Sequence, residues 1–198
     1  AIYIRISKKD ISSVEKKFNL GKIISFQGIK KGIENTNYLL KTKNKKYILT
    51  IFGKRVQKKD IPFFIKLMKQ LNEHKIFCPN PQKNKKGEYL FNIKKKPALI
   101  VSFVEGKDKK KLNTKNCYEI GKNVAKFHKV SRKIKLYRKN SMSLKEWPKI
   151  LNKIGNKCEV INPDLNLLMK DSFLEFKKKW PKNLPNGIVH GDLFIDNI

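Results

Sequence analysis

Three polar residues near the end of the chain have the types and the spacing that a catalytic loop requires. His190 is followed by Asp192 two positions later, and Asn197 comes five positions after that aspartate. A carboxylate can accept the proton of a hydroxyl group, and an amide oxygen can bind Mg²⁺ beside phosphate groups. The spacing therefore predicts phosphoryl transfer to an alcohol, with Asp192 as the base and Asn197 as a Mg²⁺ ligand.

The residues before this loop favour the catalytic interpretation over a polar surface turn. Ile188 and Val189 are apolar and lead directly into the loop, and we predict that residues 187–189 form a strand that delivers it. His190 is expected to orient the loop backbone and not to transfer a proton. The same spacing is typical of the catalytic loop of protein-kinase-like phosphotransferases.

The elements that must position the loop form two groups. Hydrophobic periodicity predicts two helices, at residues 7–18 and 60–74. Apolar segments bounded by turn residues predict a three-stranded meander between them, at 23–27, 37–41 and 46–52, and two further strands after them, at 89–93 and 98–103. Amphipathic helices are then predicted at 114–130 and 165–180, while the intervening 131–163 is helix-poor and has no readable pattern. This order predicts an α+β, protein-kinase-like bilobal fold, with a five-stranded antiparallel N-lobe at 1–104 and an incomplete helical C-lobe at 105–198.

The turn between the first two predicted strands is a candidate phosphate cover. Gly28 and Gly32 would allow the backbone to approach a ligand closely, and Asn35, Thr36 and Asn37 could donate hydrogen bonds to phosphate oxygens. A simple hairpin turn would have a similar composition. Its place between the first two strands favours the phosphate-binding interpretation.

The segment that ends the last predicted strand is a candidate adenine site. Ser102, Phe103, Val104 and Glu105 would cross from one lobe to the other, so their backbone N–H and C=O groups could pair with an adenine edge. The alternative is an ordinary strand end.

The net charge of +31 raises the question of a nucleic-acid partner. Only four of the 47 basic residues are arginine, and the lysines are scattered along the whole length. Nucleic-acid modules more often gather arginine on one element. We interpret the charge as a solvated surface and expect no specific nucleic-acid partner.

The chain lacks signals for export, a membrane or a structural metal. Its three cysteines form no C-x-x-C pair, its first residues do not resemble a signal peptide, and its longest apolar stretch, 97–104, is too short to span a bilayer. These features predict a cytoplasmic protein with no membrane partner.

With these segments in place, the chain resembles the homoserine kinases of the aminoglycoside-phosphotransferase-like superfamily over essentially its entire length. The resemblance rests on Gly-Ile-Glu-Asn-Thr-Asn-Tyr-Leu-Leu at 32–40, Cys-Pro-Asn-Pro at 78–81, Arg-Lys-Asn at 138–140 and the loop at 190–197. It implies ATP- and Mg²⁺-dependent phosphorylation of the side-chain hydroxyl of L-homoserine, giving O-phospho-L-homoserine in threonine biosynthesis. Asp192 would be the base and Asn197 the Mg²⁺ ligand.

Two further residues are candidates for binding homoserine. The planar guanidinium of Arg138 suits a bidentate contact with a carboxylate, and Asn140 lies two positions on. A surface arginine beside Lys139 is the alternative for Arg138. Other small-molecule kinases of the superfamily, of the choline or aminoglycoside type, and a basic nucleic-acid-binding protein remain the alternative functions.

The chain departs from the kinase-like pattern in two places. Thr50, itself a candidate nucleotide-binding residue, stands where many such enzymes have a strand lysine for the α- and β-phosphates. The nearby Lys54 or Arg55, or the loop backbone, would then have to supply the positive charge. The second metal-binding aspartate expected after the loop has no counterpart before Ile198. We interpret the chain as a C-terminally truncated fragment that is not expected to be active alone.

Overall fold

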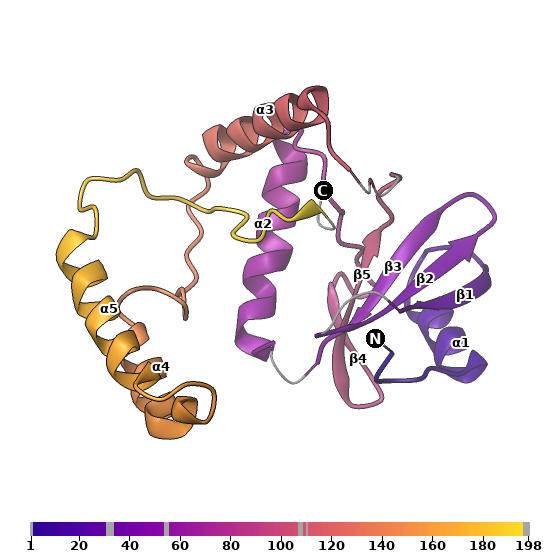
Figure 1. Cartoon of the computed structure of the whole chain (residues 1–198). Coiled ribbons are helices and arrows are strands. Elements are labelled where there is room, and N and C mark those ends of the chain that lie inside the picture. The colour runs from indigo at the N-terminus through magenta and orange to yellow at the C-terminus, as the bar shows by residue number, and fades with distance from the viewer. Residues whose placement is uncertain (1, 31–33, 54–55, 107–108, 110, 196–198) are drawn as a thin grey trace. The chain divides into compact units, whose positions relative to one another are not determined.

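The structure is a computed structural model that describes residues 2–30, 34–53, 56–106, 109 and 111–195 (Figure 1). The chain forms two compact units, one of residues Ala1–Leu136 with Gly187–Ile198 and one of residues Tyr137–Asn186. The predicted lobe boundary after residue 104 lies inside the first unit and stays a prediction.

The first unit contains a five-stranded antiparallel sheet. Its strands are β1 (Ile23–Ile29), β2 (Thr36–Thr42), β3 (Lys46–Ile51), β4 (Leu90–Ile93) and β5 (Lys96–Ser102), in the order β1-β2-β3-β5-β4. All five predicted strands are present, with ends that differ by up to two residues. Short apolar segments bounded by turn residues therefore identified the sheet correctly.

The helix α1 (Lys8–Lys17) covers one face of this sheet. Ser7 and Asp10 form a capping box at its N-terminus. Ile11 and Val14 are buried and pack against every second residue of the central strands, namely Tyr38, Leu40, Tyr47, Leu49, Ile51, Ala98 and Ile100. The larger of the two cores lies here.

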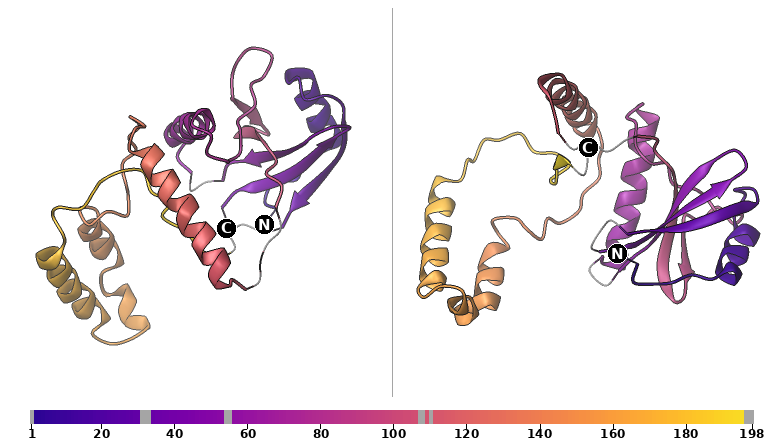
Figure 2. Two further views of the ribbon diagram at one scale, coloured as in Figure 1. Left: turned by 90° about the horizontal axis from the view of Figure 1, so that it is seen from above. Right: turned by 45° about the vertical axis from the view of Figure 1, so that its right-hand side comes forward.

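The helix α2 (Ile61–Glu73) covers part of the opposite face. It follows a short 3-10 turn, η1 (Lys58–Asp60), and has a proline in its first turn, where no backbone donor is needed. Ile61 and Ile65 pack against Leu99 and Val101 of β5. Because Leu99 and Ile100 are neighbours on one strand, α1 and α2 lie on opposite sides of the sheet, as Figure 2 also shows.

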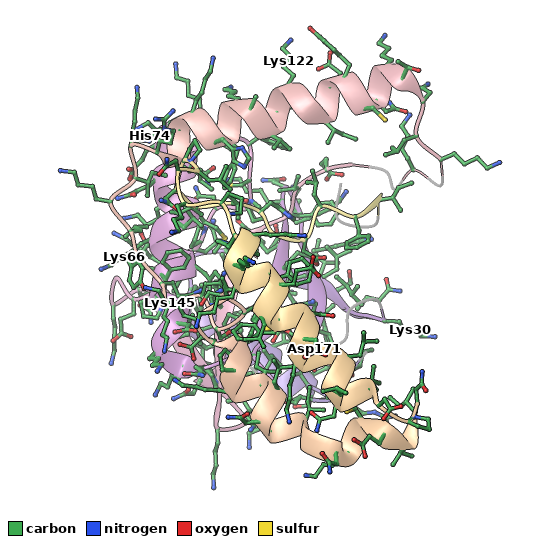
Figure 3. The ribbon with its side chains drawn as sticks, turned by 60° about the vertical axis from the view of Figure 1, so that its left-hand side comes forward. Lys30, Lys66, His74, Lys122, Lys145 and Asp171 are labelled. Carbon is green, nitrogen blue, oxygen red and sulfur yellow. The ribbon has the colours of Figure 1, made fainter. Side chains whose placement is uncertain are left out.

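The helix α3 (Thr114–Ser131) completes the first unit. Asn113 caps it through the backbone N–H of Asn116, and Lys126 donates a hydrogen bond to the Lys75 carbonyl just after α2. Charged side chains such as Lys30 and Lys122 are exposed and project outward from the ribbon (Figure 3). No helix in the described part of the chain is long and apolar enough to cross a membrane.

The second unit is a helical hairpin that the sequence pattern only half predicted. It contains α4 (Trp147–Ile154), the 3-10 segment η2 (Gly155–Val160) and α5 (Leu165–Lys179), and the Trp147 ring meets three aromatic rings, those of Phe173, Phe176 and Trp180. The helix α5 was predicted. The interpretation of 131–163 as helix-poor was wrong, because apolar residues at 147, 150, 151 and 154 already have helical spacing within a lysine-rich stretch.

The predicted strand at 187–189 is absent. These residues have no regular secondary structure. A strand needs a neighbour for its ladder of hydrogen bonds, and no strand in the described ranges pairs with this segment. The apolar pair Ile188 and Val189 therefore marked a segment that leads into the loop, but not a strand.

Candidate active site

Two of the predicted phosphate-binding residues are joined to the end of β3. Asn35 Oδ1 accepts a hydrogen bond from the Gly53 N–H at 3.1 Å, and the Thr50 hydroxyl donates to Asn37 Oδ1 at 2.8 Å. Asn37 and Thr50 face each other as a cross-strand pair of β2 and β3. The structure thus brings Asn35, Asn37 and Thr50 together at one end of the sheet.

Thr36, between these two asparagines, is directed to the other face. Its side chain is buried, and its Oγ1 accepts hydrogen bonds from the N–H groups of Tyr3 and Ile4 at 3.1 and 3.2 Å. The hydroxyl is therefore directed toward the N-terminal segment. The sequence held no signal for this contact, because the partners lie more than 30 positions away.

Two glycines near this loop have a packing role. Gly28 belongs to β1 and pairs with Tyr38, so our placement of Gly28 in the turn was wrong. A Cβ at Gly28 would collide with the end of the Ile2 side chain. A Cβ at Gly53 would collide with the backbone carbonyl oxygen of Glu34. Gly32 lies outside the described residues.

Two backbone N–H groups of the predicted adenine segment already donate hydrogen bonds within the first unit. The Ser102 N–H donates to the Asn80 carbonyl at 2.9 Å, and the Phe103 N–H donates to the Lys46 carbonyl at 3.1 Å. Glu105 forms an exposed ion pair with Lys46 at 2.8 Å. Within the described part of the chain, the Val104 N–H forms no backbone hydrogen bond, and its role as a donor to an adenine edge stays a prediction.

A hollow of about 590 Å³ opens beside this segment. Ser102, Phe103 and Glu105 line it together with the lysine-rich β2–β3 turn, but Asn35, Asn37 and Thr50 do not. The hollow is therefore next to the predicted adenine segment and is not lined by the residues predicted to bind phosphate.

The segment that leads to Asp192 is held by the end of α3. Ser131 is 2% exposed, and its Oγ lies 3.0 Å from the Ile188 carbonyl oxygen and 3.1 Å from that of His128. Gly191 has a φ of 75°, in the left-handed region that favours glycine. This turn precedes Asp192, whose side chain is exposed. Asn197 lies outside the described residues.

Replacing Ser131 by alanine is expected to loosen the segment before Asp192. The change removes the hydroxyl bonded to Ile188 and leaves a partly buried carbonyl without that donor, which is expected to cost about 0.5–1.5 kcal/mol of unfolding free energy. Faster amide exchange across 187–192, measured by mass spectrometry, would show the loosening. Ser141→Ala, at an exposed position, is the control. Unchanged exchange in Ser131→Ala would contradict the anchoring role.

The predicted homoserine-binding residues lie in the second unit. Asn140 Oδ1 accepts a hydrogen bond from the Met142 N–H at 2.9 Å, which closes a turn. Lys139 pairs with Glu146 at 2.7 Å, and its hydrogen bond lowers the pKa of the Glu146 carboxyl. Arg138 and Asn140 thus flank an ion-paired turn, and their role in binding substrate stays a prediction.

A metal position is not formed by the described residues alone. Among them, no three histidine, cysteine, aspartate or glutamate side chains gather in a way that could hold a metal ion. The predicted ligand Asn197 is not among these residues, so its role as a Mg²⁺ ligand stays a prediction.

The sequence is similar to a known protein family and, over its whole length, to curated relatives. The family model described as phosphotransferase enzyme family matches residues 25–198. The homoserine kinase of Nitrobacter winogradskyi is 34% identical over all of this chain and 61% of its own length, and that of Parvibaculum lavamentivorans is 33% identical over all of this chain and 62% of its own length. The chain thus spans less than two thirds of these curated relatives.

Two solved structures have the same fold at low sequence identity. A spectinomycin phosphotransferase in complex with ADP and spectinomycin matches 98% of this chain and 65% of its own, with a TM-score of 0.71 and 16% identity. An amicoumacin kinase in complex with AMP-PNP, Ca²⁺ and Ami matches 90% and 55%, with a TM-score of 0.65 and 13% identity. These likenesses confirm the predicted kinase-like α+β fold.

Proposed function

The chain belongs to the phosphotransferase enzyme family, and from this membership we propose that the whole protein phosphorylates the side-chain hydroxyl of L-homoserine with ATP. The product would be O-phospho-L-homoserine. The observation that carries the choice of acceptor is the similarity to homoserine kinases, which extends over the entire chain at 34% identity. The described contacts at the end of β3 and before Asp192 support the proposed positions of the nucleotide and of the base.

The nucleotide is proposed to bind on the α2 side of the sheet, over β1 to β3. Leu39 and Ile48 are partly exposed on this face and offer an apolar surface to the adenine ring. The Val104 N–H would pair with the adenine edge. The Asn37–Thr50 pair lies at the far end of β3 from that segment, where the phosphates would extend.

Charge at the phosphates must come from outside this polar pair. Thr50 is uncharged and donates its hydroxyl to Asn37, so it supplies position and no positive charge. Lys54 and Arg55, which follow β3 in the sequence, are the proposed cations and lie outside the described residues. Mg²⁺, when bound, would neutralise further phosphate charge, and Asn197 is its proposed ligand.

The proposed chemistry is an in-line displacement assisted by Asp192. The homoserine hydroxyl oxygen forms a bond to the γ-phosphorus as the bond to the ADP oxygen breaks, and the hydroxyl proton passes to the Asp192 carboxylate. The exposed position of Asp192 next to the Gly191 turn is compatible with access by a small substrate. Arg138 is proposed to pair with the homoserine carboxylate.

An acceptor comparison on the whole protein tests the proposal. Turnover with ATP is measured with homoserine, choline, methylthioribose, spectinomycin and another aminoglycoside. We expect kcat/KM for homoserine to exceed that for the others by at least about 10²-fold, because a site built to pair with a carboxylate rejects acceptors that lack one. Preferential turnover of another acceptor would contradict homoserine as the substrate and still support phosphoryl transfer.

The basic surface provides a second arm of the same experiment. A nucleic-acid-binding protein would show a Kd that rises steeply with salt, because each neutralised phosphate releases counterions. Tight binding to duplex or single-stranded DNA at physiological ionic strength, without turnover of any acceptor, would replace the kinase proposal with that alternative.

A further inference from the structure

We propose that the N-terminal segment, residues 2–6, is a strap that positions the phosphate-binding end of the sheet through the Thr36 hydroxyl. The inference deepens the proposed function and rests on it for the identity of the ligand, an adenine nucleotide. Thr36 is proposed as a positioning residue that touches no substrate.

Four hydrogen bonds hold the strap on β2. The N–H groups of Tyr3 and Ile4 donate to Thr36 Oγ1 at 3.1 and 3.2 Å. The Tyr38 hydroxyl donates to the Ile4 carbonyl at 2.9 Å and accepts from the Ile6 N–H at 3.3 Å. All four bonds therefore end on two side chains of the same face of one strand. Figure 1 shows the strap, in indigo, running alongside the sheet into α1.

The strap also buries these two side chains. Thr36 is 1% and Tyr38 is 5% exposed. The Ile2 side chain occupies the space beside Gly28, where a Cβ would collide with it. A hydroxyl at position 36 would be costly in this apolar layer without partners, and the two strap N–H groups supply them.

Thr36 lies between Asn35 and Asn37, so a contact of the strap with Thr36 also restrains the backbone of these two site residues. Side chains alternate between the faces of a strand, so the bonds of Thr36 hold the backbone from the face opposite to Asn35 and Asn37. On that opposite side, Asn35 is bonded to Gly53 and Asn37 to Thr50. Three successive residues are thus tied to two distant parts of the chain, Thr36 to the strap on one face and both asparagines to the end of β3 on the other.

A backbone held from both sides is ordered before the nucleotide arrives. If the strap contact is lost, part of the population no longer presents Asn35 and Asn37 in the binding geometry. The apparent Kd then rises by the inverse of the competent fraction. The contact should therefore influence nucleotide affinity more than the chemical step, which depends on Asp192.

The test compares three variants of the whole protein. Thr36→Val keeps the shape and removes the hydroxyl, and Thr36→Ser restores the hydroxyl. Val14→Ala weakens the same core from α1 and removes none of the four groups that form the strap hydrogen bonds. Kd for ADP is measured by calorimetry, and kcat and KM for ATP by steady-state kinetics. We expect Thr36→Val to raise Kd and KM about tenfold and to change kcat by less than about twofold. Thr36→Ser should restore both values, and Val14→Ala should lower only Tm.

Amide exchange in the nucleotide-free protein separates this inference from the proposed function. The Gly53 amide, which donates to Asn35, should exchange faster in Thr36→Val than in Val14→Ala at equal global stability. Wild-type Kd together with unchanged Gly53 exchange in Thr36→Val would overturn the strap. A wild-type protein that does not bind ADP would overturn the proposed function, and Gly53 exchange would then decide the positioning role alone.

Discussion

Asp192→Asn is expected to lower kcat of the whole protein about 10²- to 10⁴-fold, the usual cost of removing a general base. The substitution keeps the size of the side chain and removes its ability to accept a proton. Affinity for ADP should change by less than about twofold, because the proposed nucleotide contacts come from the sheet and from residues 102–105. Tm should change little, since the side chain is exposed.

The measurement needs kcat, Kd for ADP and Tm from the same preparation. Asp171→Asn is the matched control, because Asp171 is an exposed aspartate on α5 that the proposed chemistry does not use (Figure 3). We expect this control to have wild-type kcat. If Asp192→Asn retained more than about a tenth of kcat, or lost Tm in place of kcat, Asp192 would be a loop-bracing residue and not the base.

Gly53→Ala is expected to destabilise the protein and to weaken nucleotide binding together. The new Cβ would collide with the Glu34 carbonyl oxygen, a backbone atom that cannot turn away as a flexible side chain can. Relief of the collision must move Glu34 and Asn35 away from Gly53, which breaks the Asn35–Gly53 hydrogen bond. We expect a loss of about 1–3 kcal/mol of unfolding free energy, as for other overpacked sites, and about a tenfold higher Kd for ADP.

The control for this prediction carries the same substitution where space is open. A Cβ at Gly121 in α3 would meet no atom within 4 Å, so Gly121→Ala should leave ADP affinity unchanged and raise helix stability by up to about 1 kcal/mol. Denaturant unfolding of both variants measures the unfolding free energy, and titration with ADP measures Kd. Equal stability of the two variants would show that the Glu34 backbone can move without cost.

The sequence by itself determined the elements and the kind of chemistry. Strands such as β2 and β3 and the helix α2 follow from periods of two and of 3.6 residues, which are properties of short segments. The spacing of His190, Asp192 and Asn197 and the segment at 32–40 are sufficient to predict the correct family. Even α4, which our interpretation missed, has a local pattern.

Tertiary structure alone decided which partner each polar group meets. Thr36 was predicted to face phosphate, but its hydroxyl bonds a segment more than 30 residues earlier in the chain. Gly28 was placed in a turn, although it pairs with Tyr38 inside β1 and the end of the Ile2 side chain occupies the space beside it. Residues 187–189 have the apolar character of a strand without a neighbour to pair with. Local patterns report the preference of a segment, whereas hydrogen-bond partners and contacts depend on residues brought together from distant positions by packing.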